Sequence, residues 1–318
     1  MYDITTLGEL LVDFTECGTS PAGQRLFEQN AGGSVANLVA AAARFGARTG
    51  FIGKVGSDMH GAFLKEAMEG AGVDMQHLVM ADDVFTTLAF VALNSNGERA
   101  FSFARKPGAD TCLKESELPR EMLMNSRVFH TSSLSLTDEP ARTATYRAIK
   151  IARGGGAIIT YDPNYRAGIW RSKQEAVTAM RTLVKTADIM KVSDEETVLL
   201  TDASDPAEAS KRLVDAGVSI AIVTLGSDGA FVRVGAQTQL VPGFAANAVD
   251  TTGAGDSFFG GFLYRFLQLK KRAGDATLSE ACDCARFGNA VASLCVEHRG
   301  GIPAMPTLSA VEERLRRG

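Results

Sequence analysis

Short apolar runs alternate with amphipathic stretches along most of this 318-residue chain, and no other feature constrains its fold as strongly. Three-and-four periodicity predicts helices near 34–45, 58–71, 138–153, 172–187, 206–216, 255–269 and 278–297. Strand-like apolar runs lie between them, including 49–55, 157–161, 187–191 and 219–224. Alternating strands and helices favour crossover connections, so we expect an α/β fold with a mostly parallel sheet and helices on both faces.

The helix expected at 34–45 carries the clearest local signals. Val35, Leu38 and Val39 begin an apolar stripe that continues at helical spacing. Ser34 stands where an N-cap is expected, and Gly46 stands just beyond the predicted end, where a left-handed residue closes many helices.

Four strand-like segments, at 11–15, 25–29, 85–93 and 99–105, interrupt the alternation. The last two are joined around Asn96-Gly97, a dipeptide that favours a tight hairpin turn. We expect a small antiparallel sheet outside the main layer, either a lid or an ordinary edge hairpin. A chain of this length that is 45% hydrophobic can bury a substantial core. We therefore expect one domain, 1–318, with lid strands inserted at about 11–30 and 85–107.

Charge and composition argue against several classes of partner. The 33 basic and 37 acidic residues give a net charge of −4, and no basic block would track a nucleic-acid backbone. No apolar run approaches the ~20 residues of a membrane span, and the first residues form a strand pattern rather than a basic leader, so we expect a cytoplasmic protein. The five cysteines and four histidines show no metal-ligand spacing.

The segment Thr251-Thr252-Gly253-Ala254-Gly255-Asp256 is the strongest chemical signal. Its glycines allow backbone N–H groups to converge where a helix begins, and the helix dipole adds partial positive charge, so the segment can hold an anion. A carboxylate at Asp256 could accept a proton from a hydroxyl that attacks a bound phosphate. The alternative interpretation is a glycine loop followed by an ordinary helix cap.

This segment resembles the C-terminal signature of the PfkB, or ribokinase-like, carbohydrate kinases. The segment Asn30-Ala31-Gly32-Gly33-Ser34-Val35-Ala36-Asn37 resembles their N-terminal signature, and the resemblance extends from Gly8-Glu9 to Gly300-Gly301-Ile302-Pro303. It implies a ribokinase-like three-layer sandwich with a mostly parallel central sheet plus a small β lid. It also implies ATP-dependent phosphorylation of a small sugar and a homodimer formed through the lid. Neither GxxxxGK[ST] nor a protein-kinase GxGxxG loop occurs, so no other phosphate cradle competes.

By position, the resemblance implies that Asp256 is the catalytic base and that the amides of Gly253, Ala254 and Gly255 form the anion hole. It also assigns Asp250 and Thr252 to a monovalent-cation loop, which implies potassium, with the remaining ligands around 285–301.

The resemblance assigns Lys191, Ser193 and Glu196 to nucleotide binding. Ser193-Asp194-Glu195-Glu196 stands in place of the family's Asn-x-x-Glu, which organises magnesium and phosphate, so Glu196 is an indirect magnesium residue. Ser-x-x-Glu is also a helix capping box, and both roles can hold together.

Three further positions resemble the family's nucleotide loop, namely Thr224, Gly226 and Gly229. The alternative there is a glycine turn between two strands. Asn289 resembles an adenine-side residue, although a surface asparagine is the ordinary interpretation.

For the acceptor, Asp13 stands in the family's sugar-hydroxyl position, with Gly32, Gly33 and Asn37 at the N-terminal signature. A glycine pair allows a sugar to approach the backbone, and a carboxylate can accept two neighbouring hydroxyls. The alternative for the glycine pair is a turn before a helix.

Strand alternation would turn Phe101, Phe103 and Arg105 to one face, where they could form an aromatic floor and a cation for the sugar. Packing of the small sheet against the body would account for the phenylalanines equally well.

Two strings, Phe103-Ala104-Arg105-Lys106-Pro107-Gly108-Ala109-Asp110 and Asp162-Pro163-Asn164-Tyr165-Arg166, resemble the fructokinase branch and add Asn164 and Arg166 to the substrate residues. They make fructose, converted to fructose 6-phosphate, the first choice. Arg105 and Arg166 could instead bind a carboxylate, as in 2-keto-3-deoxygluconate kinases, and Arg166 could simply pair with Asp162 or Asp194. Ribose, nucleoside and aminoimidazole-riboside acceptors stay open. So does a sugar-sensing protein that keeps the fold without turnover, because Ser193 departs from the family's asparagine.

Overall fold

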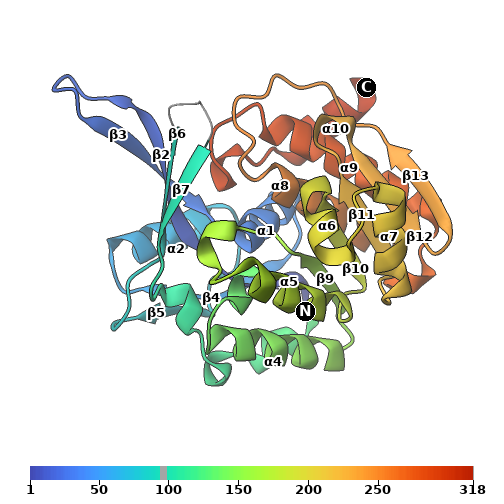
Figure 1. Ribbon diagram of the computed structural model, residues 1–318, viewed down its shortest axis with the longest axis horizontal. Helices are drawn as coiled ribbons and strands as arrows, with labels where there is room; N and C mark the ends of the chain where they lie inside the picture. Colours follow the sequence, from blue (N-terminus) through green and yellow to red (C-terminus); the bar gives the residue numbers. More distant parts are fainter. Residues whose placement is uncertain (94–98, 318) are drawn as a thin grey trace.

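A large sheet lies at the centre of the molecule (Figure 1). The computed structural model describes residues 1–93 and 99–317. Among these residues the sheet order is β13-β12-β11-β10-β9-β8-β1-β4-β5. Every neighbouring pair from β11 to β5 is parallel, whereas β12 and β13 add on in antiparallel fashion. Its strands are β1 (Tyr2–Leu7), β4 (Thr49–Gly56), β5 (Leu78–Ala81), β8 (Ser126–Ser132), β9 (Ile158–Asp162), β10 (Ile189–Ser193), β11 (Ile220–Thr224), β12 (Ala230–Val234) and β13 (Gln237–Val241).

Helices cover both faces of this sheet, as the alternation predicted. On β11, Ile220 and Ile222 belong to the apolar cluster that also contains residues of α1 (Ser34–Arg44), α8 (Ala254–Gln268) and α9 (Leu278–Cys295), whereas Ala221 and Val223 face the opposite way and belong to the cluster that contains residues of α4 (Ala141–Gly154) and α5 (Lys173–Val184). Burial of both faces explains why the strands are continuously apolar. The helices are α1 (Ser34–Arg44), α2 (Met59–Gly70), α3 (Arg120–Met124), α4 (Ala141–Gly154), α5 (Lys173–Val184), α6 (Asp194–Thr201), α7 (Pro206–Asp215), α8 (Ala254–Gln268), α9 (Leu278–Cys295) and α10 (Leu308–Arg317).

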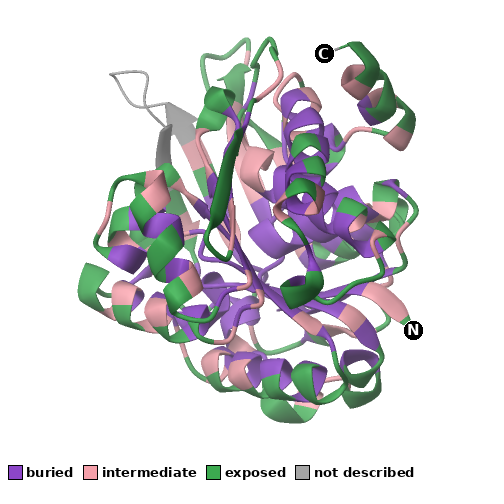
Figure 2. Ribbon diagram, turned by 90° about the vertical axis from the view of Figure 1, so that its right-hand side faces the viewer, coloured by how far each residue is buried: buried purple, intermediate pink, exposed green. Residues whose placement is uncertain are grey.

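The buried residues are concentrated along the sheet and on the inner sides of the helices that cover it (Figure 2). In the part of the chain that the structure describes, no helix combines the length and the apolar character that crossing a membrane requires.

A second sheet projects from the body at one end of the large sheet (Figure 1). It has the order β3-β2-β6-β7 and consists of β2 (Leu11–Thr19), β3 (Arg25–Gly32), β6 (Leu88–Leu93) and β7 (Arg99–Ala104). Its two hairpins are antiparallel as expected, but they join through a parallel pair, β2 with β6. The turn predicted at Asn96-Gly97 and the side chain of Phe101 lie outside the described residues.

Several expected boundaries need correction. The N-cap of α1 is Gly33, not Ser34, and Ser34 is the first helical residue, with its hydroxyl bonded to Glu9. Gly46 does follow the helix in a left-handed conformation, with φ of 92°. The sequence patterns did not predict the strands β5, β8 and β13 or the helices α3, α6 and α10. For α6 a signal existed, because its capping box had been recognised as such.

Candidate active site

A cavity of about 520 Å³ lies between the small sheet and the carboxyl ends of the large sheet's strands. The small sheet contributes one wall, through Asp13, Val91 and Phe103. The body contributes the opposite side, through residues from α1, the loop after β9, and the start of α8. These are Ser34, Asn37, Asn164, Arg166, Thr251, Thr252, Gly253 and Asp256. Residues from both sequence signatures therefore meet in one cavity.

Asp256 lies in the first turn of α8 and is 7% exposed. Asn37 donates its side-chain N–H to Oδ2 at 2.9 Å, and Asn164 donates to Oδ1 at 3.0 Å. Burial raises the pKa of Asp256, while the Asn37 hydrogen bond and the charges of Lys191 and Arg166 oppose that rise. Two amides thus fix the carboxylate, and each oxygen keeps a lone pair for a further donor.

Asp13 faces the same cavity from β2. Burial raises the pKa of Asp13 to about 7, and the charge of Arg166 opposes the rise. A Cβ on Gly32 would lie 2.1 Å from Oδ2 of Asp13, so only glycine leaves room for this carboxylate. The side-chain oxygen of Asn37 is buried without a hydrogen-bond partner in the described structure, and it lies against Gly301, where an added Cβ would come within 2.3 Å of it.

Arg166 reaches the cavity and donates to the Tyr165 carbonyl at 3.0 Å. In the described structure it forms no ion pair with Asp162 or Asp194, which were its alternative partners. Its charge acts instead on Asp13 and Asp256. The guanidinium is therefore placed to meet an acceptor.

Arg105 does not reach this cavity, contrary to the prediction. Its guanidinium binds Oδ2 of Asp110 through Nε at 2.8 Å and Nη2 at 2.6 Å, and also donates to Thr137 and to the Leu134 carbonyl. Strand β7 ends at Ala104, so the alternation that would have turned Arg105 toward Phe103 no longer applies.

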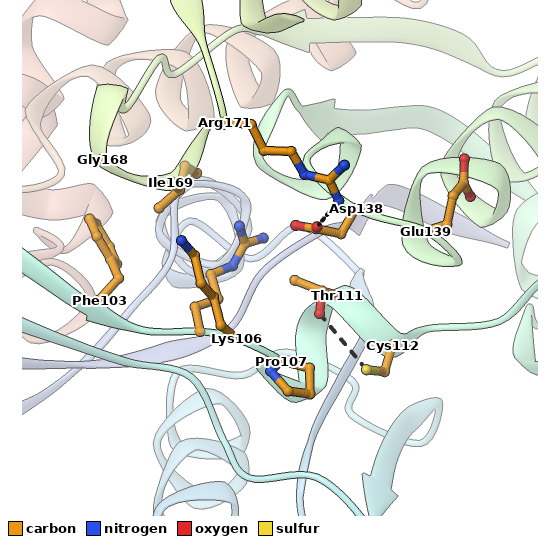
Figure 3. Close-up of a pocket in the computed structure, with 11 residues that line it drawn as sticks. Phe103, Lys106, Pro107, Thr111, Cys112, Asp138, Glu139, Gly168, Ile169 and Arg171 are labelled. Carbon is orange, nitrogen blue, oxygen red and sulfur yellow. Dashed lines mark hydrogen bonds and ion pairs between the residues drawn. The ribbon is translucent and has the colours of Figure 1, made fainter.

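Arg105 lines a second cavity, of about 500 Å³, that borders the first at Phe103. Figure 3 shows Phe103 on its wall, with Gly168 and Ile169 beside it and Asp138 paired with Arg171. Phe103, a residue predicted to contact the substrate, thus lines both cavities.

A third cavity, of about 550 Å³, lies on the other side of the glycine-rich segment. Gly226 and Asn289, two residues predicted to bind the nucleotide, line it among small and apolar residues that include Ser227, Gly243, Phe244, Ala245, Ala246, Ala248, Ala254, Ala292, Ser293 and Val296. Asn289 is 6% exposed and donates to the carbonyls of Val241 and Pro242, so it is not a surface residue. Thr251 lines both this cavity and the first cavity, which contains Asp256.

Two predicted nucleotide residues hold the backbone around this third cavity. Thr224 ends β11 and donates to the Val192 carbonyl of β10 at 3.3 Å. Gly229 has φ of 102°, and a Cβ there would lie 2.2 Å from the Val241 carbonyl. We infer that these positions shape the loop that carries Gly226.

Lys191 lies beneath the start of α8. Its ammonium pairs with Asp162 at 2.8 Å, and both side chains are buried. A Cβ on Gly255 would lie 2.8 Å from that ammonium, so the lysine abuts the N-terminal turn. Burial raises the pKa of Asp162, while the charge of Lys191 opposes that rise. Asp162 was missed as a site residue, although it begins the Asp-x-Asn-x-Arg string.

Ser193 and Glu196 form the capping box of α6. Glu196 accepts from the Ser193 amide at 2.9 Å and from the Tyr165 amide at 2.6 Å. It therefore joins the end of β10 to the loop that carries Asn164 and Arg166.

The carboxylate of Asp250 connects the loop before α8 to the loop after α9. It accepts from the amides of Thr252 at 2.9 Å and Gly300 at 3.0 Å. Gly253 follows in a left-handed conformation, with φ of 75°, and α8 begins at Ala254. The Ala254 amide donates to the Thr251 carbonyl at 3.3 Å, whereas the next amide, that of Gly255, has no partner within the helix and can receive an anion. Within the described residues, no cluster of three or more His, Cys, Asp or Glu side chains is suited to a metal.

Comparison with known proteins agrees with this geometry. The family model described as pfkB family carbohydrate kinase matches residues 1–308. The chain belongs to the pfkB family of carbohydrate kinases. It is an ATP-dependent sugar kinase.

Probable fructokinase-5 of Arabidopsis thaliana is 37% identical to this pfkB-family chain over 320 residues, which cover 98% of this chain and 97% of that protein. The crystal structure of a Xylella fastidiosa fructokinase with bound ATP gives a TM-score of 0.92 at 32% identity, covering 100% of this chain and 99% of that one. A Vibrio cholerae fructokinase bound to fructose, ADP and calcium ion gives a TM-score of 0.88 at 32% identity, covering 99% of each chain. These similarities confirm the predicted ribokinase-like architecture.

Proposed function

We propose that this kinase transfers the γ-phosphate of ATP to fructose and forms fructose 6-phosphate. One observation carries the proposal: the glycine-rich segment is a common wall between a polar cavity that contains Asp256 and a largely apolar cavity lined by Gly226 and Asn289. Two substrates bound on its two sides would meet at the first turn of α8. Relatives similar over the whole chain are fructokinases, and one of them was solved with fructose and ADP.

In this proposal, Asp256 accepts the proton of the attacking hydroxyl. Asn37 and Asn164 hold its two oxygens and leave room for that hydroxyl. The amides of Gly253, Ala254 and Gly255 would bind the transferred phosphoryl group, and the ammonium of Lys191, which is paired with Asp162, lies next to Gly255. Asp13 and Arg166 orient the sugar, and Gly32 leaves room for the Asp13 carboxylate.

Magnesium and potassium would supply positive charge for the phosphates. Glu196 already accepts two backbone amides, which suits an indirect role in organising magnesium through the β10–α6 junction. Asp250 and Thr252 offer hard oxygen donors on a closed loop pair, which fits a monovalent cation. A variant of the Vibrio cholerae fructokinase was solved with fructose, ADP and potassium ion.

A sugar acid is the second candidate. The guanidinium of Arg166 faces the cavity without an ion-pair partner in the described structure, and it could bind the carboxylate of 2-keto-3-deoxygluconate. Arg105 does not assist, because Asp110 already holds it.

Coupled ADP release with a panel of acceptors tests both candidates. Fructose should give the highest kcat/KM among fructose, 2-keto-3-deoxygluconate, ribose and aminoimidazole riboside, with ATP, magnesium and potassium present. A site that reads a carboxylate should prefer the sugar acid by ~100-fold or more, and Arg166→Gln should abolish that preference. If no sugar releases ADP, the kinase proposal fails and a sugar-sensing role replaces it.

We also propose a homodimer that forms through the small sheet of a single-domain chain. On the face away from the cavity, Phe14 stacks on Phe90 with ring centroids 5.3 Å apart, and Phe27 packs edge-on at 6.1 Å. Phe27 and Phe90 are each 37% exposed, which leaves an apolar patch for a second copy. Phe90→Glu should convert a dimer to a monomer in sedimentation. The proposed compartment is the cytoplasm, which localisation of a tagged chain would test.

A further inference from the structure

Glu9 lies at the joint between the two sheets, and the roles proposed above do not use it. It follows β1, precedes β2, and is 0% exposed. It nevertheless lines the acceptor cavity together with Asp13 and Asp256. Burial raises the pKa of Glu9, while hydrogen bonds from Ser34 and the charge of Arg105 oppose that rise. A buried carboxylate is costly unless its hydrogen bonds are made.

One carboxylate oxygen of Glu9 caps α1, although Glu9 is 25 positions from Ser34 in the sequence. Oε1 accepts from the Ser34 amide at 2.5 Å and from the Ser34 hydroxyl at 2.6 Å. The local N-cap is Gly33, which has no side chain, and the first turn of α1 contains no acid. Glu9 therefore supplies the oxygen that an N-cap residue provides elsewhere, and its charge faces the positive end of the helix.

The other carboxylate oxygen of Glu9 is connected through further hydrogen bonds to the root of the small sheet, which is the segment just after the end of β7. Oε2 accepts from the Ser132 hydroxyl at 3.2 Å, and the oxygen of that hydroxyl accepts from the Leu134 amide at 3.3 Å. The Leu134 carbonyl accepts from Arg105 at 2.8 Å, and Arg105 is held by Asp110. A continuous chain of hydrogen bonds thus connects the end of β7, the end of β8 and the start of α1.

The position of α1 matters because Asn37 lies one turn beyond Ser34. Its side-chain amide donates to Asp256 at 2.9 Å, and Asn37 also lines the cavity that contains Asp256. A Cβ on Gly33 would lie 2.4 Å from the Glu9 carbonyl, so the backbone of Glu9 already packs closely against the residue that precedes α1. A shift of α1 would move Asn37 and would therefore disturb both its hydrogen bond to Asp256, the proposed base, and the lining of the cavity.

We propose that Glu9 is a positioning residue: its carboxylate fixes the start of α1 to β8 and to the root of the small sheet, so that Asn37 and Asp256 meet the acceptor hydroxyl in reactive geometry. This inference rests on the proposed transfer of phosphate to a sugar. It assigns Glu9 no contact with the sugar and no proton transfer.

Three variants test it by steady-state kinetics with fructose and ATP. Glu9→Ala should raise KM for fructose and lower kcat by ~10-fold each, because misplacement of reacting groups is expensive, while KM for ATP stays within ~2-fold. Glu9→Gln should recover most of the loss, since its oxygen can accept both Ser34 hydrogen bonds and Ser132 can turn to accept from the amide. Asp205→Ala is the matched control, because Asp205 caps α7 by accepting from Glu208 at 2.9 Å. It should lower Tm without changing any kinetic constant.

Hydrogen exchange provides a readout that does not depend on turnover. Exchange at the Ser34 amide should accelerate in Glu9→Ala and keep the wild-type rate in Glu9→Gln and Asp205→Ala. If the wild-type protein phosphorylates no sugar, the proposed function fails while this measurement still tests the joint.

Three results would overturn the inference. Glu9→Ala could keep wild-type kinetics and exchange. Glu9→Gln could be as impaired as Glu9→Ala, which would indicate a role for the charge or contact with the sugar. Alternatively, KM for fructose and for ATP could rise together with a fall in Tm, which would indicate general loosening.

Discussion

The proposed acceptor cavity, which contains Asp256, and the proposed nucleotide cavity, which is lined by Gly226 and Asn289, share a wall at Thr251 but are lined by different kinds of residue. The acceptor cavity is lined by charged and amide side chains, and burial raises the pKa of Glu9, Asp13 and Asp256. The nucleotide cavity is lined mainly by glycines, alanines and other small residues. The first therefore depends on specific polar groups, and the second on backbone shape and open space. Substitutions that remove a charge should impair the first, and substitutions that add bulk should impair the second.

Replacing the proposed base should have the largest effect. Asp256→Asn keeps the side chain's shape but cannot accept the proton, so kcat should fall by ~100-fold or more. Fructose binding by calorimetry should stay near the wild-type value. An Asn variant with wild-type kcat would remove Asp256 from this role.

The shared wall should respond to added bulk. In Gly255→Ala the new Cβ would lie 2.8 Å from the buried Lys191 ammonium and would displace it from the phosphate side. We expect kcat/KM for ATP to fall by ~10-fold or more, with little change in fructose affinity. Gly154→Ala is the matched control, because a Cβ there meets nothing within 4 Å. Equal kinetics for the two variants would contradict the placement of Lys191.

Filling the nucleotide cavity should affect one substrate alone. Ala292 lines that cavity from α9, and Ala292→Leu would occupy space that the nucleotide needs. KM for ATP should rise by about 5–10-fold, and KM for fructose should not change. A rise in both constants would show that the two cavities do not act separately.

The smallest expected effect is a pH dependence from Asp13. Because the pKa of Asp13 is raised to about 7, its carboxylate gains charge as pH rises from about 6.5 to about 7.5, and KM for fructose should fall about threefold over that range. Asp13→Asn should have a higher but pH-independent KM over this range.

The stability effect has the opposite direction. The folded pKa of Asp13 lies above the ordinary value of about 3.9, so its contribution to stability is complete below that value and is lost as pH rises through 7. The Tm of Asp13→Asn relative to wild type should therefore increase between pH 5 and 8. A constant difference would mean that the pKa of Asp13 is not raised.

Sequence determined the parts of this protein that depend on local rules. Helix and strand periods fixed the layered sheet, because an apolar stripe must be buried against another element. The glycines at 253 and 255, followed by an acid at 256, marked the start of α8. Gly253 has a left-handed backbone conformation and Gly255 lies close to the Lys191 ammonium, and both situations favour a residue without a side chain.

Tertiary structure decided which polar groups meet. Arg105 looked like a sugar ligand, but the end of β7 turns it toward Asp110. Lys191 and Gly255 lie 64 positions apart in the sequence, and Glu9 and Ser34 are 25 apart, yet each pair is in close contact. No local period encodes such contacts, because they depend on how whole strands and helices pack. The sequence therefore identified the chemistry of the wall between the cavities, and packing alone revealed what holds it in place.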